Sequence, residues 1–267
     1  MIRLDDLSVT YPGGVQALHP TSLDFRSGQF TVLLGPSGAG KSTLLRSLNG
    51  LVRATAGKVV SETSGDIAER RVLRRHRRQT AMVFQQHQLI GRLSALGNVM
   101  TGRLAYHSTW RTLLPMPAAD RRLALACLDR VGLLQDALRR ADQLSGGQQQ
   151  RVGIARALAQ TPSLILADEP VASLDPATAT RVLSLLHDIC RSDRISAIVS
   201  LHQVQLATRF ADRIVGIAAG SVVFDGPKAM LTDRHLEQIY GRPTDHPERS
   251  AQQQVPALEG ALALAME

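Results

Sequence analysis

The sequence predicts a mixed α/β domain with an antiparallel β edge and a separate helical subdomain, and three observations lead to this fold class. First, an apolar run over residues 30–34 ends in small residues, and a helical pattern begins at Lys41. Second, two later apolar runs, residues 163–167 and 196–201, end in polar side chains, as buried strands do. Third, residues 2–10 and 15–25 alternate between apolar and polar, which predicts antiparallel strands, the first of them at an edge.

The segment from residue 29 to 43 organises the rest of the chain. Gly35, Gly40, Lys41 and Ser42 follow the pattern G-x-x-x-x-G-K-[ST]. Glycines let successive backbone N–H groups turn inward toward a phosphate, and the helix that follows adds its positive N-terminal end. The Lys41 ammonium suits β- and γ-phosphates, and the Ser42 hydroxyl suits Mg²⁺. The alternative, a glycine-rich turn that matches by chance, is disfavoured by the strand before the loop and the amphipathic helix after it.

The residues expected to bind a nucleotide are therefore contiguous. They are Gly35, Pro36, Ser37, Gly38, Ala39, Gly40, Lys41, Ser42 and Thr43.

Composition narrows the class of protein. The chain has 267 residues, 44% of them hydrophobic, yet it has no uncharged apolar stretch long enough to cross a bilayer and no apolar signal sequence after Met1. Cys127 and Cys190 lack metal-ligand spacing and lie in helical patterns, so we expect reduced core residues of a cytosolic protein.

The net charge of +8 predicts an anionic neighbour, such as a nucleotide, a membrane face or a nucleic acid. Much of the excess lies in an arginine-rich helix at residues 70–78. Two interpretations of this helix stay open, a solvated face and a contact with a membrane surface or a partner.

The remaining elements can be placed by periodicity. Residues 51–66 predict short strands and turns, residues 80–84 predict a strand with a polar tip at Gln85, and residues 89–144 predict the helical subdomain. Residues 214–225 predict a hairpin and residues 231–239 a short helix. The compact domain spans residues 2–241, with the helical subdomain at about 89–150. We expect a loosely ordered tail over residues 242–267.

Two acids, Asp168 and Glu169, follow the apolar run at 163–167. Paired acids at a strand end are costly unless they have a role there. Asp168 is suited to hold Mg²⁺ through water and Glu169 to orient and polarise an attacking water. Solvated loop acids are the alternative, and the phosphate loop makes it much weaker.

Three further features are candidates for the same site. Ser145 can cap a helix behind Gly146 and Gly147, which makes a second anion site of the helix N-terminus kind. His202 ends the strand at 196–201 and is a candidate γ-phosphate sensor, although a lone histidine there is more often structural. Tyr11 could stack on an adenine or could be an ordinary strand-end aromatic.

Together these pieces resemble the nucleotide-binding subunit of an ABC transporter over about residues 2–241. Residues 35–42 look like its Walker A motif, 144–148 like its signature, 164–169 like Walker B with the catalytic acid, and 172–175 like its D-loop. Gln85 is similar to the Q-loop glutamine, which is counted with the catalytic and Mg²⁺ residues, and His202 to the switch histidine. Val171-Ala172 departs from the threonine found after the proline in many relatives.

The resemblance implies how the chain works. ATP and Mg²⁺ are the expected ligands, with Ser42, Gln85 and Asp168 at the metal and Glu169 as base. Two copies face each other head to tail, so that ATP on one copy is completed by Ser145, Gly146, Gly147 and Gln148 of the other. Residues 85–104 press on transmembrane permease subunits, which receive solute from a periplasmic or extracellular binding protein. The chain would then lie at the cytoplasmic face of the inner membrane.

A narrower resemblance favours phosphonate importers. It rests on Asn98-Val99-Met100-Thr101-Gly102-Arg103-Leu104, on residues 108–111 and 113–115, and on residues 200–204 with the segment up to Ile214. Importers for phosphite, phosphate or amino acids are the alternatives within this class.

The rival class is a soluble ABC ATPase that acts on DNA or ribosomes. Such proteins usually carry a long coiled coil, zinc ligands or two fused cassettes, and none of these is evident in the sequence. We therefore expect no nucleic-acid partner.

Overall fold

The structure, a computed structural model, describes residues 2–62, 65–85, 88–107, 110 and 116–241. The expected tail over 242–267 lies outside the described residues, and so do 108–109, 111 and 113–115 of the narrower resemblance. The domain bounds at 89, 150 and 241 stay predictions.

Six strands form the central sheet in the order β10-β9-β3-β8-β7-β6. Strands β9, β3, β8, β7 and β6 run parallel, and β10 joins the edge as the antiparallel partner of β9. The bounds are β3 Phe30–Leu34, β6 Thr80–Val83, β7 Leu164–Ala167, β8 Ser196–Leu201, β9 Arg213–Ala218 and β10 Ser221–Pro227. The three apolar runs of the sequence are thus neighbouring strands, and every residue of β3, β6 and β7 is buried.

A second, four-stranded sheet has the order β2-β1-β4-β5. Its bounds are β1 Ile2–Thr10, β2 Gln16–Phe25, β4 Ala56–Ser61 and β5 Gly65–Asp66. The expectation that residues 2–10 form an edge strand is wrong, because β1 pairs with β2 on one side and with β4 on the other. The second partner strand was hard to recognise in the sequence, because β4 begins Ala56-Gly57-Lys58 and shows little alternation between apolar and polar residues.

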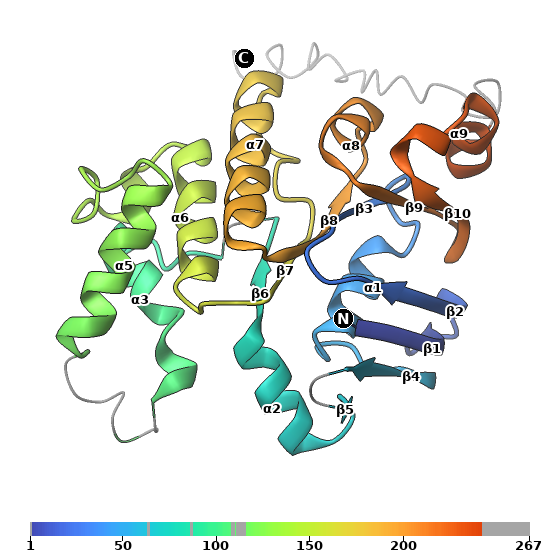
Figure 1. The fold of residues 1–267 in the computed structure, drawn as a ribbon, viewed down its shortest axis with the longest axis horizontal. Helices are drawn as coiled ribbons and strands as arrows, with labels where there is room; N and C mark the ends of the chain where they lie inside the picture. Colours follow the sequence, from blue (N-terminus) through green and yellow to red (C-terminus); the bar gives the residue numbers. More distant parts are fainter. Residues whose placement is uncertain (1, 63–64, 86–87, 108–109, 111–115, 242–267) are drawn as a thin grey trace, which may run out of the picture.

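Helices occupy the connections between the strands. The long ones are α1 Lys41–Leu48, α2 Arg70–Gln79, α5 Ala118–Arg130, α6 Gly146–Leu158, α7 Pro176–Asp193 and α9 Asp233–Tyr240. The short ones are α3 Ala95–Thr101, α8 Val204–Phe210, η1 Leu104–Tyr106, η2 Ala141–Gln143 and η3 Lys228–Met230. In Figure 1 the green helices α3, α5 and α6 lie on the side of the central strands away from the blue strands β1 and β2.

The helical pattern expected through residue 144 is broken after α5. Residues 131–140 form turns, and Leu134 and Leu138 are exposed rather than part of a helix face. Gly132, at a φ of 67°, ends the helix in the left-handed region that glycine adopts without strain.

Alternation along the central strands divides the core in two. Leu33, Leu166, Ile198 and Val215 pack with α1 and the small sheet. The residues one position along, such as Val32, Ala167 and Val199, pack with the helices on the opposite face.

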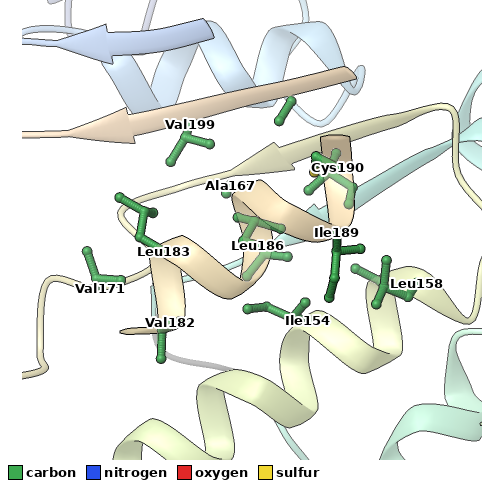
Figure 2. Close-up of a cluster of buried hydrophobic side chains, with 14 of the residues drawn as sticks. Ile154, Leu158, Ala167, Val171, Val182, Leu183, Leu186, Ile189, Cys190 and Val199 are labelled. Atoms are coloured by element: carbon green, nitrogen blue, oxygen red, sulfur yellow. The ribbon is translucent and has the colours of Figure 1, made fainter. Parts of the chain in front are cut away.

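Helix α7 anchors that second face. Asp175 caps it by accepting from the Thr178 N–H at 3.0 Å, and Pro176 occupies its first turn. Figure 2 shows Val182, Leu183, Leu186 and Ile189 of α7 among side chains of α6 and of the sheet.

We expect Leu186→Ala to lower the free energy of unfolding by about 2–5 kcal/mol, because the side chain is fully buried and its loss leaves a cavity. Chemical denaturation followed by circular dichroism measures the change. Leu138→Ala is the matched control, since Leu138 is 76% exposed, and its unfolding should be nearly unchanged. Equal destabilisation of the two variants would contradict this description of the core.

Candidate functional site

The candidate residues that follow β3, β6, β7 and β8 lie at one edge of the central sheet. Parallel pairing sets Leu34 beside Leu201, Val199 beside Ala167, and Ala167 beside Val83. The carboxyl ends of β3, β8, β7 and β6 therefore coincide, and the segments that follow them begin close together. In open α/β sheets this edge is where ligands bind.

The loop between β3 and α1 has no room for larger residues at two of its glycines. A Cβ added to Gly35 would lie 2.2 Å from the backbone oxygen of Ile217. A Cβ on Gly40 would lie 2.5 Å from the Ala17 oxygen, at a φ of 103° that side chains rarely adopt. The loop is thus wedged between β9 and β2, which fixes its path.

Lys41 lies inside this loop. Its ammonium donates to the carbonyl oxygens of Gly35 and Pro36, both at 2.8 Å, and its nitrogen lies 3.6 Å from a carboxylate oxygen of Glu169. Burial lowers the pKa of Lys41, and the Glu169 carboxylate opposes that shift. A buried cation therefore faces the centre of the loop, where an anionic ligand would be attracted to it.

Ser42 and Asp168 form the closest contact of the site. The Ser42 hydroxyl donates to Asp168 Oδ1 at 2.6 Å, and the Ser200 hydroxyl donates to the same oxygen at 3.1 Å. Arg46, one turn along α1, lies 3.3 Å from Asp168 Oδ2. Asp168 is buried, so these partners compensate for the loss of its hydration.

Glu169 has a strained backbone. Its φ is 45°, in the left-handed region, and its N–H donates to the Ser200 hydroxyl at 2.8 Å. Such a conformation costs free energy in a residue with a side chain, and strain of this kind clusters at functional sites. Here it directs the Glu169 carboxylate toward Lys41.

Three other candidates border this centre less closely. Tyr11 lies beside α1, with its hydroxyl 3.2 Å from that of Thr43. Gln85 follows β6 and is exposed, and among the described residues no hydrogen bond joins it to Ser42 or Asp168. His202 is exposed just beyond β8, and its carbonyl accepts from the Tyr240 hydroxyl at 2.7 Å.

The segment 145–148 lies elsewhere. The Ser145 hydroxyl accepts from the Gln148 N–H at 3.3 Å, and the Gln148 side chain accepts from the Ser145 N–H at 2.9 Å, so the expected helix cap of α6 is present. Ser145, Gly147 and Gln148 line a pocket of about 560 Å³ whose lining includes no residue of the phosphate loop. Within one chain the structure therefore does not bring this segment to the loop.

Two residues of the site are absent from the sequence-based candidates. Ser200 supports both acids, and Arg46 pairs with Asp168. Ser200 could have been found as the single hydroxyl within the apolar run Ala197-Ile198-Val199-Ser200-Leu201. Arg46 was harder to predict, because the sequence shows only that it lies four residues after Ser42, on the same face of a helix.

Both cysteines are buried and free, as expected. Burial raises the pKa of both thiols, that of Cys190 to about 12, so these side chains are unreactive core residues.

A glycine-rich loop between a buried strand and a helix, with an acid pair on a neighbouring strand, is typical of α/β domains that bind nucleoside triphosphates. A family model described as ABC transporter matches residues 18–172, more than half of the chain. The chain therefore belongs to the ABC transporter family.

Two relatives illustrate this kinship. The phosphite import ATP-binding protein PxtA of Stutzerimonas stutzeri is 62% identical over 99% of this chain and 96% of its own length. The phosphonates import ATP-binding protein PhnC 3 of Nostoc sp. is 63% identical over 90% of this chain and 92% of its own length.

A solved structure agrees with the fold. The ATP-binding cassette MJ0796, described as a dimer in a post-hydrolysis state bound to ADP and Pi, superposes with a TM-score of 0.74. It is 35% identical and covers 85% of this chain and 99% of that one. The predicted α/β fold with an antiparallel edge is confirmed.

Ser200→Ala should lower the free energy of unfolding by about 1–3 kcal/mol, because Asp168 and the Glu169 N–H each lose a partner in a buried setting. Thermal or chemical denaturation measures the effect. Ser184→Ala removes a hydroxyl that bonds an exposed carboxylate, that of Asp188, and should be nearly neutral. If Ser200→Ala were as stable as Ser184→Ala, Ser200 would not support the acid pair.

Proposed function

We propose that the chain is the ATP-hydrolysing, energy-coupling subunit of a binding-protein-dependent ABC importer for phosphonates. One observation carries the enzymatic part of this proposal. Lys41, Ser42, Asp168 and Glu169 converge at one sheet edge, with the Ser42 hydroxyl 2.6 Å from Asp168 and the Lys41 nitrogen 3.6 Å from Glu169. A cation, two oxygen donors and a strained acid are the groups that ATP hydrolysis requires.

The loop residues 35–43 bind the phosphates of ATP. Their backbone N–H groups and the N-terminus of α1 attract the anionic chain, and Lys41 turns from the loop carbonyls to the β- and γ-phosphates. Tyr11, held beside α1 through Thr43, stacks on the adenine.

The residues present also suit Mg²⁺. Ser42 and Asp168 offer hard oxygen donors close together, and Gln85 completes the set from the end of β6. When bound, the ion neutralises the charge that develops on the phosphates.

Glu169 acts as the general base toward the attacking water, and His202 senses the γ-phosphate. Ser200 holds the Glu169 N–H, so the carboxylate starts from a fixed backbone. Gln85 lies between the sheet and the helices that follow, which suits it to relay the state of the site to them.

A second copy of the chain completes the site. Ser145, Gly146, Gly147 and Gln148 are separate from the loop of their own chain, and Ser145 and Gly146 are exposed at the start of α6. In a head-to-tail dimer they contact the ATP bound to the other copy. The dimeric state of the MJ0796 cassette supports this arrangement.

The permease subunits dock on residues 85–104. Within this range the described residues Ile90, Leu93 and Leu104 are exposed by 54%, 38% and 43%, which gives a partner apolar surface to cover. Among the described residues, no helix combines the length and apolarity needed to cross a membrane. We infer a peripheral subunit at the cytoplasmic face of the inner membrane, which receives solute through the permease from a binding protein.

The relatives named above handle phosphorus oxyanions, and both phosphonate and phosphite occur in their names. Phosphonate is the ligand that we propose and phosphite the alternative. Phosphate and amino acids are less favoured, and neither relative named above has a nucleic-acid role in its name.

The test is ATP hydrolysis by the chain reconstituted with its permease and binding protein. Methylphosphonate should stimulate turnover, whereas phosphate and amino acids should not. Glu169→Gln is the control, and it should bind ATP without hydrolysing it. Stimulation by phosphite alone would make phosphite, instead of phosphonate, the proposed substrate. Stimulation by nucleic acid alone would overturn the importer proposal.

A further inference from the structure

A basic groove lies apart from the nucleotide site, between the end of α1, the strands β4 and β5, and helix α2. Its volume is about 620 Å³, and no residue of the loop 35–43 lines it. Five basic side chains line it, from Arg53, Lys58, Arg70, Arg74 and Arg77, against the single carboxylate of Asp66.

The charge of the basic groove is largely unpaired. The side chains of Arg53, Arg70 and Arg74 make no hydrogen bond or ion pair within the part of the chain that the structure describes. Among the described residues, the Lys58 ammonium pairs only with the Asp5 carboxylate, at a distance of 3.9 Å. Like charges gathered around one groove repel each other, so a multivalent anion there would be stabilising.

The charges at the N-terminus of helix α2 are opposite to those usually found there. Its first turn holds arginines and no acid, although the N-terminus of a helix carries a partial positive charge that repels cations. The preceding Glu69 does not cap the helix through its side chain. Arginines in this position are explained if an anion binds beside them, because it then interacts with both the helix end and the side chains.

Ser47 adds an independent observation. It lines the basic groove and is 2% exposed, yet its hydroxyl has no hydrogen-bond partner among the residues that the structure describes. Buried hydroxyls are usually paired, so a donor without a partner indicates a ligand or an ion. The negative end of α1 does not counteract such an anion, since Arg77 already donates to the Asn49 and Gly50 carbonyls at 3.1 and 2.8 Å.

We propose that the basic groove binds a phosphate or phosphonate oxyanion that carries a small apolar group. Arg53, Arg70 and Arg74 pair with its oxygens, and Ser47 donates to it. Val52 and Leu73, half-buried along the same groove, contact the apolar part. The oxyanion can come from a free organophosphorus compound or from the headgroup of an anionic phospholipid.

The test is isothermal titration of the full chain, with ADP and Mg²⁺ present, using methylphosphonate and phenylphosphonate. Arg70→Gln/Arg74→Gln should weaken binding about tenfold or more, because charge-assisted hydrogen bonds are lost. Arg71→Gln/Arg75→Gln is the matched control: it removes the same charge from the same helix, but at positions that do not line the groove. This control should bind nearly as the unmodified chain does.

Two more variants complete the experiment. Ser47→Ala should weaken binding several-fold without loss of folding stability, because its hydroxyl has no hydrogen-bond partner to lose among the described residues. Lys41→Ala should bind the phosphonates unchanged, which separates the basic groove from the nucleotide loop.

Flotation with phosphatidylglycerol or phosphatidylcholine vesicles identifies whether the oxyanion comes from a lipid headgroup. Binding of the anionic vesicles alone, sensitive to Arg70 and Arg74, assigns the site to lipid.

The proposal is overturned if neither phosphonate nor anionic vesicle binds. It is overturned equally if the two arginine pairs have the same effect, or if only Lys41→Ala abolishes binding.

Discussion

The parallel pairing of β3, β8, β7 and β6 is the constraint on which the rest of the structure depends. Because the strands share one direction and one register, the segments that follow Leu34, Val83, Ala167 and Leu201 begin at the same edge. Lys41 lies more than a hundred residues before Asp168 and Glu169 in the sequence and meets them only through this alignment. The Ser200 hydroxyl donates to Asp168 and accepts from the Glu169 N–H, so both acids are fixed to the rigid sheet rather than to a flexible loop.

Helix α1 joins the sheet to the smaller antiparallel one. Its first turn carries Lys41 and Ser42, while Leu44, Leu45 and Leu48 are fully buried between the two sheets. The other face of the central sheet is covered by the helices around α7. The same short helix thus holds the phosphate loop at one end and borders the basic groove at the other, through Ser47.

The sequence predicted those parts of the fold that local patterns determine. Apolar runs located β3, β7 and β8, and a capping residue, Ser145, located the start of α6. The site residues were predictable where a motif joins them to a strand end, as for Lys41 and Asp168. Ser200 and Arg46 were missed because their role is set by contacts with Asp168, a distant residue in the sequence, which no local pattern encodes.

Strand β1 was misplaced at an edge for the same reason, since its second partner β4 shows little alternation between apolar and polar residues. The predicted helical pattern was wrongly extended over Leu134 and Leu138, because exposed leucines also occur in turns.

We propose that each ATP site is divided between two chains. Mixing two inactive variants tests it most directly, Lys41→Ala with a defective loop and Ser145→Arg with a blocked signature segment. A mixed dimer contains one intact site, made of Lys41 from one chain and Ser145 from the other. ATP-dependent association, measured by analytical ultracentrifugation, should appear in the mixture and in neither variant alone. Association of the Ser145→Arg chain alone to the extent of the unmodified chain would contradict the claim.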